Sequence, residues 1–273
     1  MSDKPIPDEV QQIQTAYRRR ILDCWNIPPG SRVLEIGCGQ GDMTAVLAEA
    51  VGPTGRIVAT DIASRNYGSP LTLGEATDLI KASELGDRIE FHFETDITNP
   101  QTDFEQFDFA VMAHCSWYFD SAEQLKQTLT AVSKKAKNLC FVEWNTVPNS
   151  MEQIPHLLAV NIQGFLEAFK PESRANVRSP FTATQLQQII AESGWKITNT
   201  ASPSTEGLQD ADWEIGECLS RVGRELDDPT MTPIRRHLLE GQMDTLRQIA
   251  KPTGNTPLSS IAFRGLTDGE LWR

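Results

Sequence analysis

The stretch that decides the fold is VLEIGCGQGD, residues 33–42. A short apolar run, typical of a buried parallel strand, leads into glycines at every second position, Gly37, Gly39 and Gly41. An acid, Glu35, stands two residues before the first glycine. A strand that enters a glycine-rich turn and then a helix presents backbone N–H groups at the carboxyl edge of a sheet. The stretch therefore predicts a site for a nucleotide-like ligand.

The glycine spacing argues against a dinucleotide. The fingerprint G-x-G-x-x-G requires a third glycine at position 42 or 44, depending on which glycine is counted first. Those positions hold Asp42 and Thr44. Glu35 and Asp42 also flank the turn and would repel a pyrophosphate, whereas a cationic, zwitterionic ligand tolerates them. An NAD-dependent oxidoreductase is therefore disfavoured.

Strand-like and helix-like segments alternate on both sides of this stretch. Apolar runs predict strands over residues 32–37, 55–61, 88–96, 107–114, 138–144, 195–200 and 258–266. Apolar residues at helical spacing predict helices over residues 8–25, 41–51, 72–85, 121–136 and 182–195. This order implies an α/β, Rossmann-like fold with a doubly wound, mostly parallel, seven-stranded sheet.

Two long segments interrupt the alternation: residues 147–178, which look helical, and residues 206–255, with helical stretches near 211–225 and 233–250. We expect a single domain over residues 1–273, in which both insertions and the helix over 8–25 reach the carboxyl ends of the strands. The mixed aromatic and aliphatic composition of the insertions suits a helical cap over a ring-rich small molecule. Amphipathic helices that seal the sheet edge, or that form a homodimer contact, would have the same composition.

The charge balance limits the partners. The chain has 37 acidic residues against 25 Lys and Arg, a formal net charge of −12. This argues against nucleic acid or an anionic membrane as the main partner, because phosphate binding needs a basic face. The start of the sequence lacks an apolar leader, and no run approaches the ~18 apolar residues of a membrane span. Five cysteines without a CxxC pair indicate reduced thiols, as in a cytoplasmic protein.

With the acid–glycine motif of residues 35–41, the chain resembles the class I S-adenosylmethionine-dependent methyltransferases. The resemblance covers residues 30–145 well, and residues 180–266 by the order of elements. It implies that S-adenosyl-L-methionine is the cofactor and that backbone approach at the glycines admits its methionyl part.

The resemblance extends to residues that follow the next strands. Asp61 matches the family's acid that accepts hydrogen bonds from both ribose hydroxyls, although a helix-capping acid would stand there too. Asp96 and Ile97 match the adenine site, with turn chemistry as the alternative, and Ile62 would cover the other ring face. Tyr17 would reach the methionine carboxylate, unless it only belongs to the apolar stripe of its helix. The expected cofactor contacts are Tyr17, Glu35, Gly37, Gly39, Gly41, Asp61, Ile62, Asp96, Ile97 and His114.

The stretch AHCSWYF, residues 113–119, should lie at the lip of this site. It lacks the Asp/Asn-Pro-Pro-Tyr of amino methyltransferases that act on nucleic acids and protein amides. It also lacks the acids of the magnesium-dependent catechol enzymes, so no metal is expected. Histidine titrates near neutral pH, which makes His114 the candidate base for a hydroxyl acceptor; alternatively it bonds the backbone or lines the methionyl pocket. Expected acceptor contacts, each with a packing or surface role as the alternative, are Trp117, Tyr118, His156, Trp213 and His237.

These observations favour a small-molecule O-methyltransferase, and the architecture resembles the small-molecule methyltransferases of fungal and bacterial secondary metabolism. More distantly, the chain resembles the O-methyltransferases of fungal indole-alkaloid pathways of the roquefortine–oxaline type. Two alternatives stay open. One is N-methylation of an alkaloid nitrogen. The other is a cofactor-binding cyclase or a non-catalytic protein, because every intact motif concerns the cofactor and none the acceptor.

Overall fold

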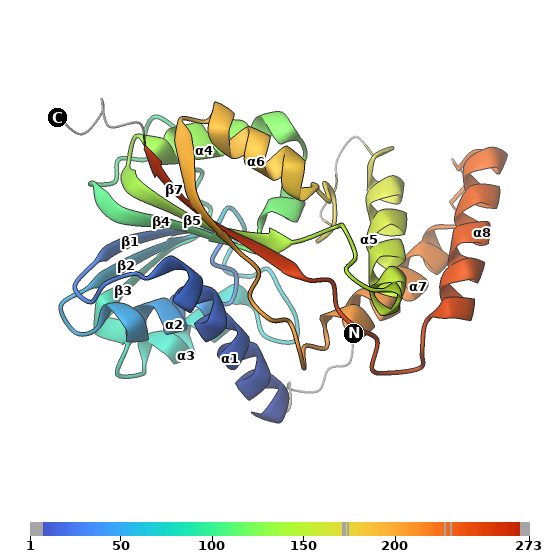
Figure 1. Ribbon diagram of the computed structural model, residues 1–273, viewed down its shortest axis with the longest axis horizontal. Coiled ribbons are helices and arrows are strands. Elements are labelled where there is room, and N and C mark those ends of the chain that lie inside the picture. Colours follow the sequence, from blue (N-terminus) through green and yellow to red (C-terminus); the bar gives the residue numbers. More distant parts are fainter. Residues whose placement is uncertain (1–7, 171–172, 174, 227, 230, 268–273) are drawn as a thin grey trace.

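The structure, a computed structural model, describes residues 8–267 except 171–172, 174, 227 and 230. Its centre is a seven-stranded sheet with the order β3-β2-β1-β4-β5-β7-β6 (Figure 1). The strands are β1 (Arg32–Ile36), β2 (Arg56–Thr60), β3 (Ile89–His92), β4 (Phe107–Ala113), β5 (Ala136–Trp144), β6 (Trp195–Ala201) and β7 (Ser260–Thr267).

Five strands, β1 to β5, pair in parallel, and β7 runs antiparallel between β5 and β6. The predicted fold class, a mostly parallel seven-stranded sheet, is thereby confirmed. One strand is shorter than predicted. We expected it to run to residue 96, but β3 ends at His92, and Glu94 has a φ of 53°. A left-handed residue turns the chain out of the extended conformation, so the polar–apolar alternation continues beyond the strand itself.

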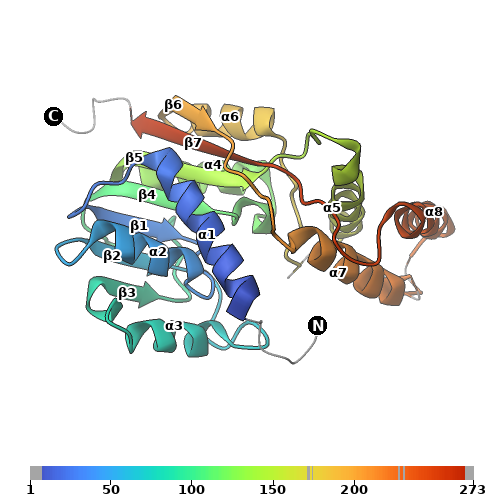
Figure 2. The ribbon, with the colours of Figure 1, turned by 60° about the horizontal axis from the view of Figure 1, so that its bottom comes forward.

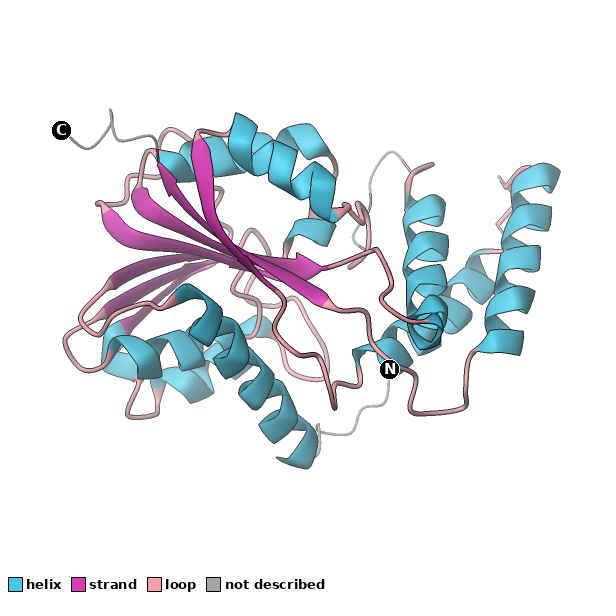
Figure 3. Ribbon diagram, in the orientation of Figure 1, coloured by secondary structure: helices cyan, strands magenta, loops and turns pink. Residues whose placement is uncertain are grey.

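Helices cover both faces of the sheet (Figure 3). On one face lie α1 (Asp8–Trp25), α2 (Asp42–Val51) and α3 (Leu73–Lys81), and on the other lie α4 (Ala122–Ser133) and α6 (Ala183–Glu192). Each face has its own apolar core, with Trp25, Leu47 and Val111 among the buried residues of the first and Leu125, Leu139 and Phe263 among those of the second. Parallel strands need such two-sided cover because both of their faces are apolar.

The two insertions meet in a helical cap beyond the carboxyl end of β5 (Figures 1 and 2). The first contributes α5 (Ile154–Glu167), and the second contributes α7 (Asp210–Glu225) and α8 (Pro233–Ile249). Helix α5 packs against both of the others, around a core that includes Ile162, Cys218 and Met243. The expected helix over 147–178 is shorter in the structure, because only a 3-10 turn, Met151–Gln153, precedes α5.

A buried carboxylate joins two helices of this cap. Glu167 of α5 is 2% exposed and forms ion pairs with Arg221 of α7 and with Lys170. Ser173 donates a further hydrogen bond to the same side chain. Among the described residues, no helix combines the length and the apolar character needed to cross a bilayer.

Glu35 lies beneath the glycine turn rather than on its open side. The side chain is 2% exposed, and Thr44 Oγ1 of α2 donates a hydrogen bond of 2.6 Å to its Oε2. Burial raises the pKa of Glu35 to about 8. The side chain therefore joins β1 to α2 and supports the turn from below.

This burial predicts a pH dependence of stability. Between the ordinary pKa of 4.5 and the folded value of about 8, the native state holds a proton that the unfolded state has lost. The free energy of unfolding should therefore fall as pH rises through this window, by up to ~1.4 kcal/mol per pH unit. Glu35→Gln cannot ionise and should remove this decline. Urea unfolding of both proteins at several pH values measures this free energy. If it changed with pH equally in both proteins, the prediction would be contradicted.

Candidate functional site

The glycine turn after β1 has an open backbone at its centre. Gly37, Gly39 and Gly41 have φ values of 74°, 54° and 86°, a region that side chains disfavour. A Cβ on Gly37 would lie 2.7 Å from Cys115 Cβ, and one on Gly41 would lie 2.6 Å from Ile80 Cδ1. A Cβ on Gly39 would meet no atom within 4 Å. Packing against Cys115 therefore requires Gly37, Gly41 approaches the flexible end of the Ile80 side chain, and Gly39 borders free space.

Asp61, directly after β2, faces this turn. Its Oδ2 accepts a hydrogen bond of 2.9 Å from Gly39 N, and its Oδ1 accepts one of 2.8 Å from Ala63 N. A carboxylate has about four acceptor positions, so two remain for the ribose hydroxyls that the sequence predicts here. Thr95 N donates to the carbonyl oxygen of Asp61 at 3.0 Å, which brings the segment after β3 to the same edge.

The predicted adenine contacts lie on that neighbouring segment. Asp96 is exposed, and its Oδ1 accepts hydrogen bonds from the amide and hydroxyl of Thr98. Its Oδ2 has no hydrogen bond to the described part of the chain and is available to an amine. Ile97 is buried beside it, and Ile62, after β2, is 68% exposed. Open backbone at Gly39, free acceptors on Asp61 and these apolar side chains fit S-adenosylmethionine.

His114 stands where β4 ends and carries a strained backbone. Its φ is 50°, which is uncommon for a residue other than glycine and is often found at functional sites. Tyr17 Oη of α1 lies 2.8 Å from Nε2, and Glu143 Oε1 of β5 lies 3.1 Å from Nδ1. The structure thus gives Tyr17 a partner in the histidine, whereas the sequence predicts one in the methionine carboxylate.

Glu143 determines how these three residues share protons. The side chain is 1% exposed. Ser116 N, Ser116 Oγ and Trp144 N donate hydrogen bonds to it, and His114 Nδ1 lies 3.1 Å from its Oε1. Hydrogen bonds from three donors compensate a buried negative charge, and a carboxylate can only accept a hydrogen bond from the histidine. Nδ1 of His114 therefore carries a hydrogen, and Nε2 accepts the hydrogen of the Tyr17 hydroxyl.

Glu143 is the residue of the site that sequence reasoning missed. It stands in the apolar run FVEW, residues 141–144, and is not among the predicted site residues. An acid inside an otherwise buried strand is the signal that points to it, because a buried carboxylate needs donors around it.

Aromatic rings form the wall next to His114. The ring of Trp144 lies 4.7 Å from that of His114, 6.2 Å from that of Tyr17 and 5.6 Å from that of His156. His156, predicted to reach the acceptor, is fully buried and accepts a hydrogen bond from Leu258 N. Burial lowers the pKa of His156 to about 4, so this side chain stays neutral while it packs against Trp144.

The other predicted acceptor contacts are spread over several elements. Trp117 and Tyr118 form a short 3-10 helix, Ser116–Tyr118, in which the tryptophan is buried and the tyrosine is 44% exposed. Trp213 of α7 is 45% exposed. His237 is exposed on α8, the outermost helix of the cap, and the structure does not bring it to His114 (Figure 1).

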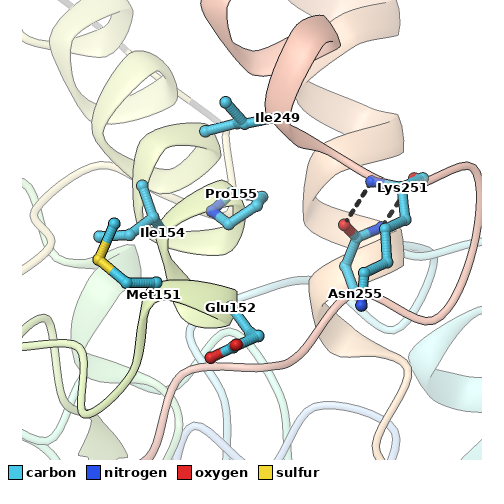
Figure 4. A pocket seen from close by; sticks show the side chains of 7 residues that line it. All are labelled: Met151, Glu152, Ile154, Pro155, Ile249, Lys251 and Asn255. Carbon is cyan, nitrogen blue, oxygen red and sulfur yellow. Dashed lines mark hydrogen bonds between the residues drawn. The ribbon is translucent and has the colours of Figure 1, made fainter.

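The cap also contains a pocket of about 340 Å³ (Figure 4). It lies between the start of α5 and the end of α8, with Met151, Pro155, Ile249 and Lys251 among its lining residues. None of the predicted site residues lines it. The glycine turn and the His114 cluster therefore remain the candidate active site.

Comparisons with known proteins agree with this geometry. A family model described as a methyltransferase domain matches residues 10–200. The chain is 24% identical to the methyltransferase phomM' of Diaporthe leptostromiformis over 266 residues, 81% of this chain and 68% of that protein. A solved cyclopropane-fatty-acyl-phospholipid synthase-like protein from Lactobacillus casei is 34% identical, with a TM-score of 0.84 over 96% of this chain and 94% of that one. The [4+2]-cyclase SpnF shares the fold, with 14% identity and a TM-score of 0.55 over 93% of this chain and 80% of that one.

A matched pair of glycine substitutions tests the cofactor assignment. Both Gly39→Ala and Gly37→Ala place a side chain at a positive φ, at a cost of about 1–2 kcal/mol each. Gly39→Ala meets free space, so it should fold and lose at least about tenfold in affinity for S-adenosylhomocysteine. Gly37→Ala also collides with Cys115 and should lose more stability. Calorimetric titration and thermal unfolding measure both, and unchanged affinity of a folded Gly39→Ala protein would contradict the assignment.

Proposed function

Because this chain belongs to the class I S-adenosylmethionine-dependent methyltransferases, we propose that it transfers a methyl group to a hydroxyl oxygen of a ring-rich small molecule in secondary metabolism. The observation that carries the proposal is the pair formed by the buried Glu143 and the partly exposed His114 at the carboxyl edge of the sheet. It provides a proton acceptor close to the glycine turn.

The chemistry explains why this pair favours oxygen. When bound, S-adenosylmethionine supplies an activated methyl group. The protein orients the reactants, excludes water and transfers the proton. A hydroxyl must lose its proton as its oxygen is methylated, so a base next to it contributes directly to the rate. A neutral amine can attack without such help, and an amine acceptor would leave the pair without a role in the transfer.

The cap supports a small acceptor. Helix α7 is joined to α1 by a hydrogen bond of 2.9 Å from Gln14 Nε2 to Asp210 Oδ2, so the cap and the N-terminal helix meet near the site. The exposed rings of Tyr118 and Trp213 offer flat apolar surface to a ring-rich molecule. A polymeric acceptor would need an open groove at the place where α1 and α7 contact each other, so this contact favours a small molecule.

A second candidate is methylene transfer to an alkene. The Lactobacillus casei protein, 34% identical, is described as cyclopropane-fatty-acyl-phospholipid synthase-like. Ring closure on a methylated alkene also needs a base, to remove a proton from the added methyl group, and His114 would serve there as well.

An isotope experiment separates these candidates. The purified protein is incubated with S-adenosylmethionine that carries a trideuterated methyl group and with a panel of hydroxylated aromatics, alkaloid amines and unsaturated phospholipids. Methylation of oxygen or nitrogen retains all three deuterium atoms in the product, whereas cyclopropane formation retains two. Product fragmentation then distinguishes oxygen from nitrogen. Cofactor binding without any product would support a non-catalytic or cyclase role and contradict the proposal.

The role of His114 gives a further prediction. His114→Ala should lower turnover by about 10²–10⁴-fold and leave the affinity for S-adenosylhomocysteine nearly unchanged. His92→Ala is the control, because His92 lies on the edge strand β3 against Phe104. Enzyme kinetics and calorimetry measure both variants. A collapse of cofactor affinity in His114→Ala would assign this residue to the cofactor pocket instead.

A further inference from the structure

We infer that Tyr17 of α1 is the residue that takes the proton from the acceptor, and that His114 and Glu143 stand behind it as a relay. The inference rests on the proposed transfer to a hydroxyl oxygen. It begins with an observation: both ring nitrogens of His114 are already bonded, Nε2 to Tyr17 and Nδ1 to Glu143. An acceptor therefore finds no free nitrogen on the base itself.

Tyr17 is held firmly in this position. Its ring is 3% exposed and stacks on Trp144 with an angle of 12° between the planes. Neighbouring residues anchor the helix on either side, Arg18 through an ion pair of 3.1 Å with Asp42 and Gln14 through its bond to Asp210. Moving the ring away from Nε2 would break this packing, so the route that leaves the core intact passes through the hydroxyl.

The hydroxyl of Tyr17 can both give and receive a proton. A phenol has one hydrogen to donate and two acceptor positions. Burial raises the pKa of Tyr17, so the group keeps its hydrogen for His114. The side chain of Ser260 is hydrogen-bonded to Tyr17 as well, which takes one of the two acceptor positions of Oη and leaves the other for the incoming molecule.

Glu143 makes His114 the end point of the relay. Within the described part of the chain, His114 is the one cation-forming group that pairs with this buried carboxylate. A buried negative charge without a partner is costly, so an imidazolium beside it is favoured. Glu143 thus acts as a positioning residue that sets the tautomer and stabilises the charged histidine.

The proposed step balances. The oxygen of the acceptor gains the methyl group, and the bonding pair of that group stays with the sulfur of the cofactor. The proton of the acceptor passes to Tyr17 Oη while the proton of Tyr17 passes to Nε2 of His114. The products are a methyl ether, S-adenosylhomocysteine and an imidazolium paired with Glu143, and the proton leaves to solvent after product release.

Nitrogen NMR tests the arrangement without an acceptor. The protein has four histidines, and comparison with His114→Ala assigns the signals of this one in ¹⁵N-labelled protein with S-adenosylhomocysteine bound. The relay requires a protonated Nδ1 and an unprotonated Nε2. Tyr17→Phe and Glu143→Gln should each shift these signals. Glu167→Gln, which alters another buried carboxylate, should not. A protonated Nε2 in the wild-type protein would overturn the inference.

Kinetics with a hydroxylated acceptor from the isotope experiment tests the proton path. Tyr17→Phe should lower kcat by about 10²-fold or more, with KM for the acceptor and affinity for S-adenosylhomocysteine within about twofold of wild type. A Tyr17→Phe protein that retains kcat overturns the relay and leaves O-methylation standing. Absence of an O-methylated product from the wild-type protein instead rejects the proposed function. If Tyr17→Phe does not fold, the wild-type NMR result decides.

Discussion

A buried carboxylate at the end of β5 holds the candidate active site together. Glu143 accepts hydrogen bonds from a backbone amide of its own strand, from the amide and hydroxyl of Ser116, and from His114. These donors belong to β5 and to the turn after β4, so one side chain joins two neighbouring strand ends. A carboxylate removed from water costs several kcal/mol unless such donors replace its hydration, which is why the turn must close around it. The left-handed backbone of His114 is held within this closed turn.

The helical cap is built from segments that are far apart in the sequence. Helix α5 follows β5, whereas α7 and α8 come between β6 and β7, yet all three pack around a common core. In an α/β sheet the ends of the chain segments converge on the carboxyl edge, where ligands bind. The bond from Gln14 to Asp210 adds the N-terminal helix to this group. The predicted cofactor contacts thus lie mostly on the sheet edge, and the cap is built from elements that the sheet does not require.

The same fold occurs in proteins whose names describe different reactions. A cyclopropane-fatty-acyl-phospholipid synthase-like protein and a [4+2]-cyclase share the fold with this chain, and a methyltransferase is similar to it in sequence. The glycine turn and the acid after β2 concern the cofactor in each reading of the sequence. The choice of reaction lies in the groups that face the acceptor, and a fold by itself does not specify them.

The sequence by itself determined the sheet, the order of its elements and the identity of the cofactor. Local periodicity and glycine spacing carry that information, since a strand, its turn and the next helix are neighbours in the chain. The predicted boundaries were wrong where a local pattern continued past the end of its element. This happened for β3 beyond His92 and for the expected helix over 147–178. Only the tertiary structure decided which groups touch His114. Tyr17 is 97 positions away from it and Glu143 is 29, and no periodicity reports a contact between side chains so far apart. Burial had the same origin: Glu35, Glu143 and His156 are ordinary polar residues in the sequence, and packing from several elements removed them from water and gave them their roles.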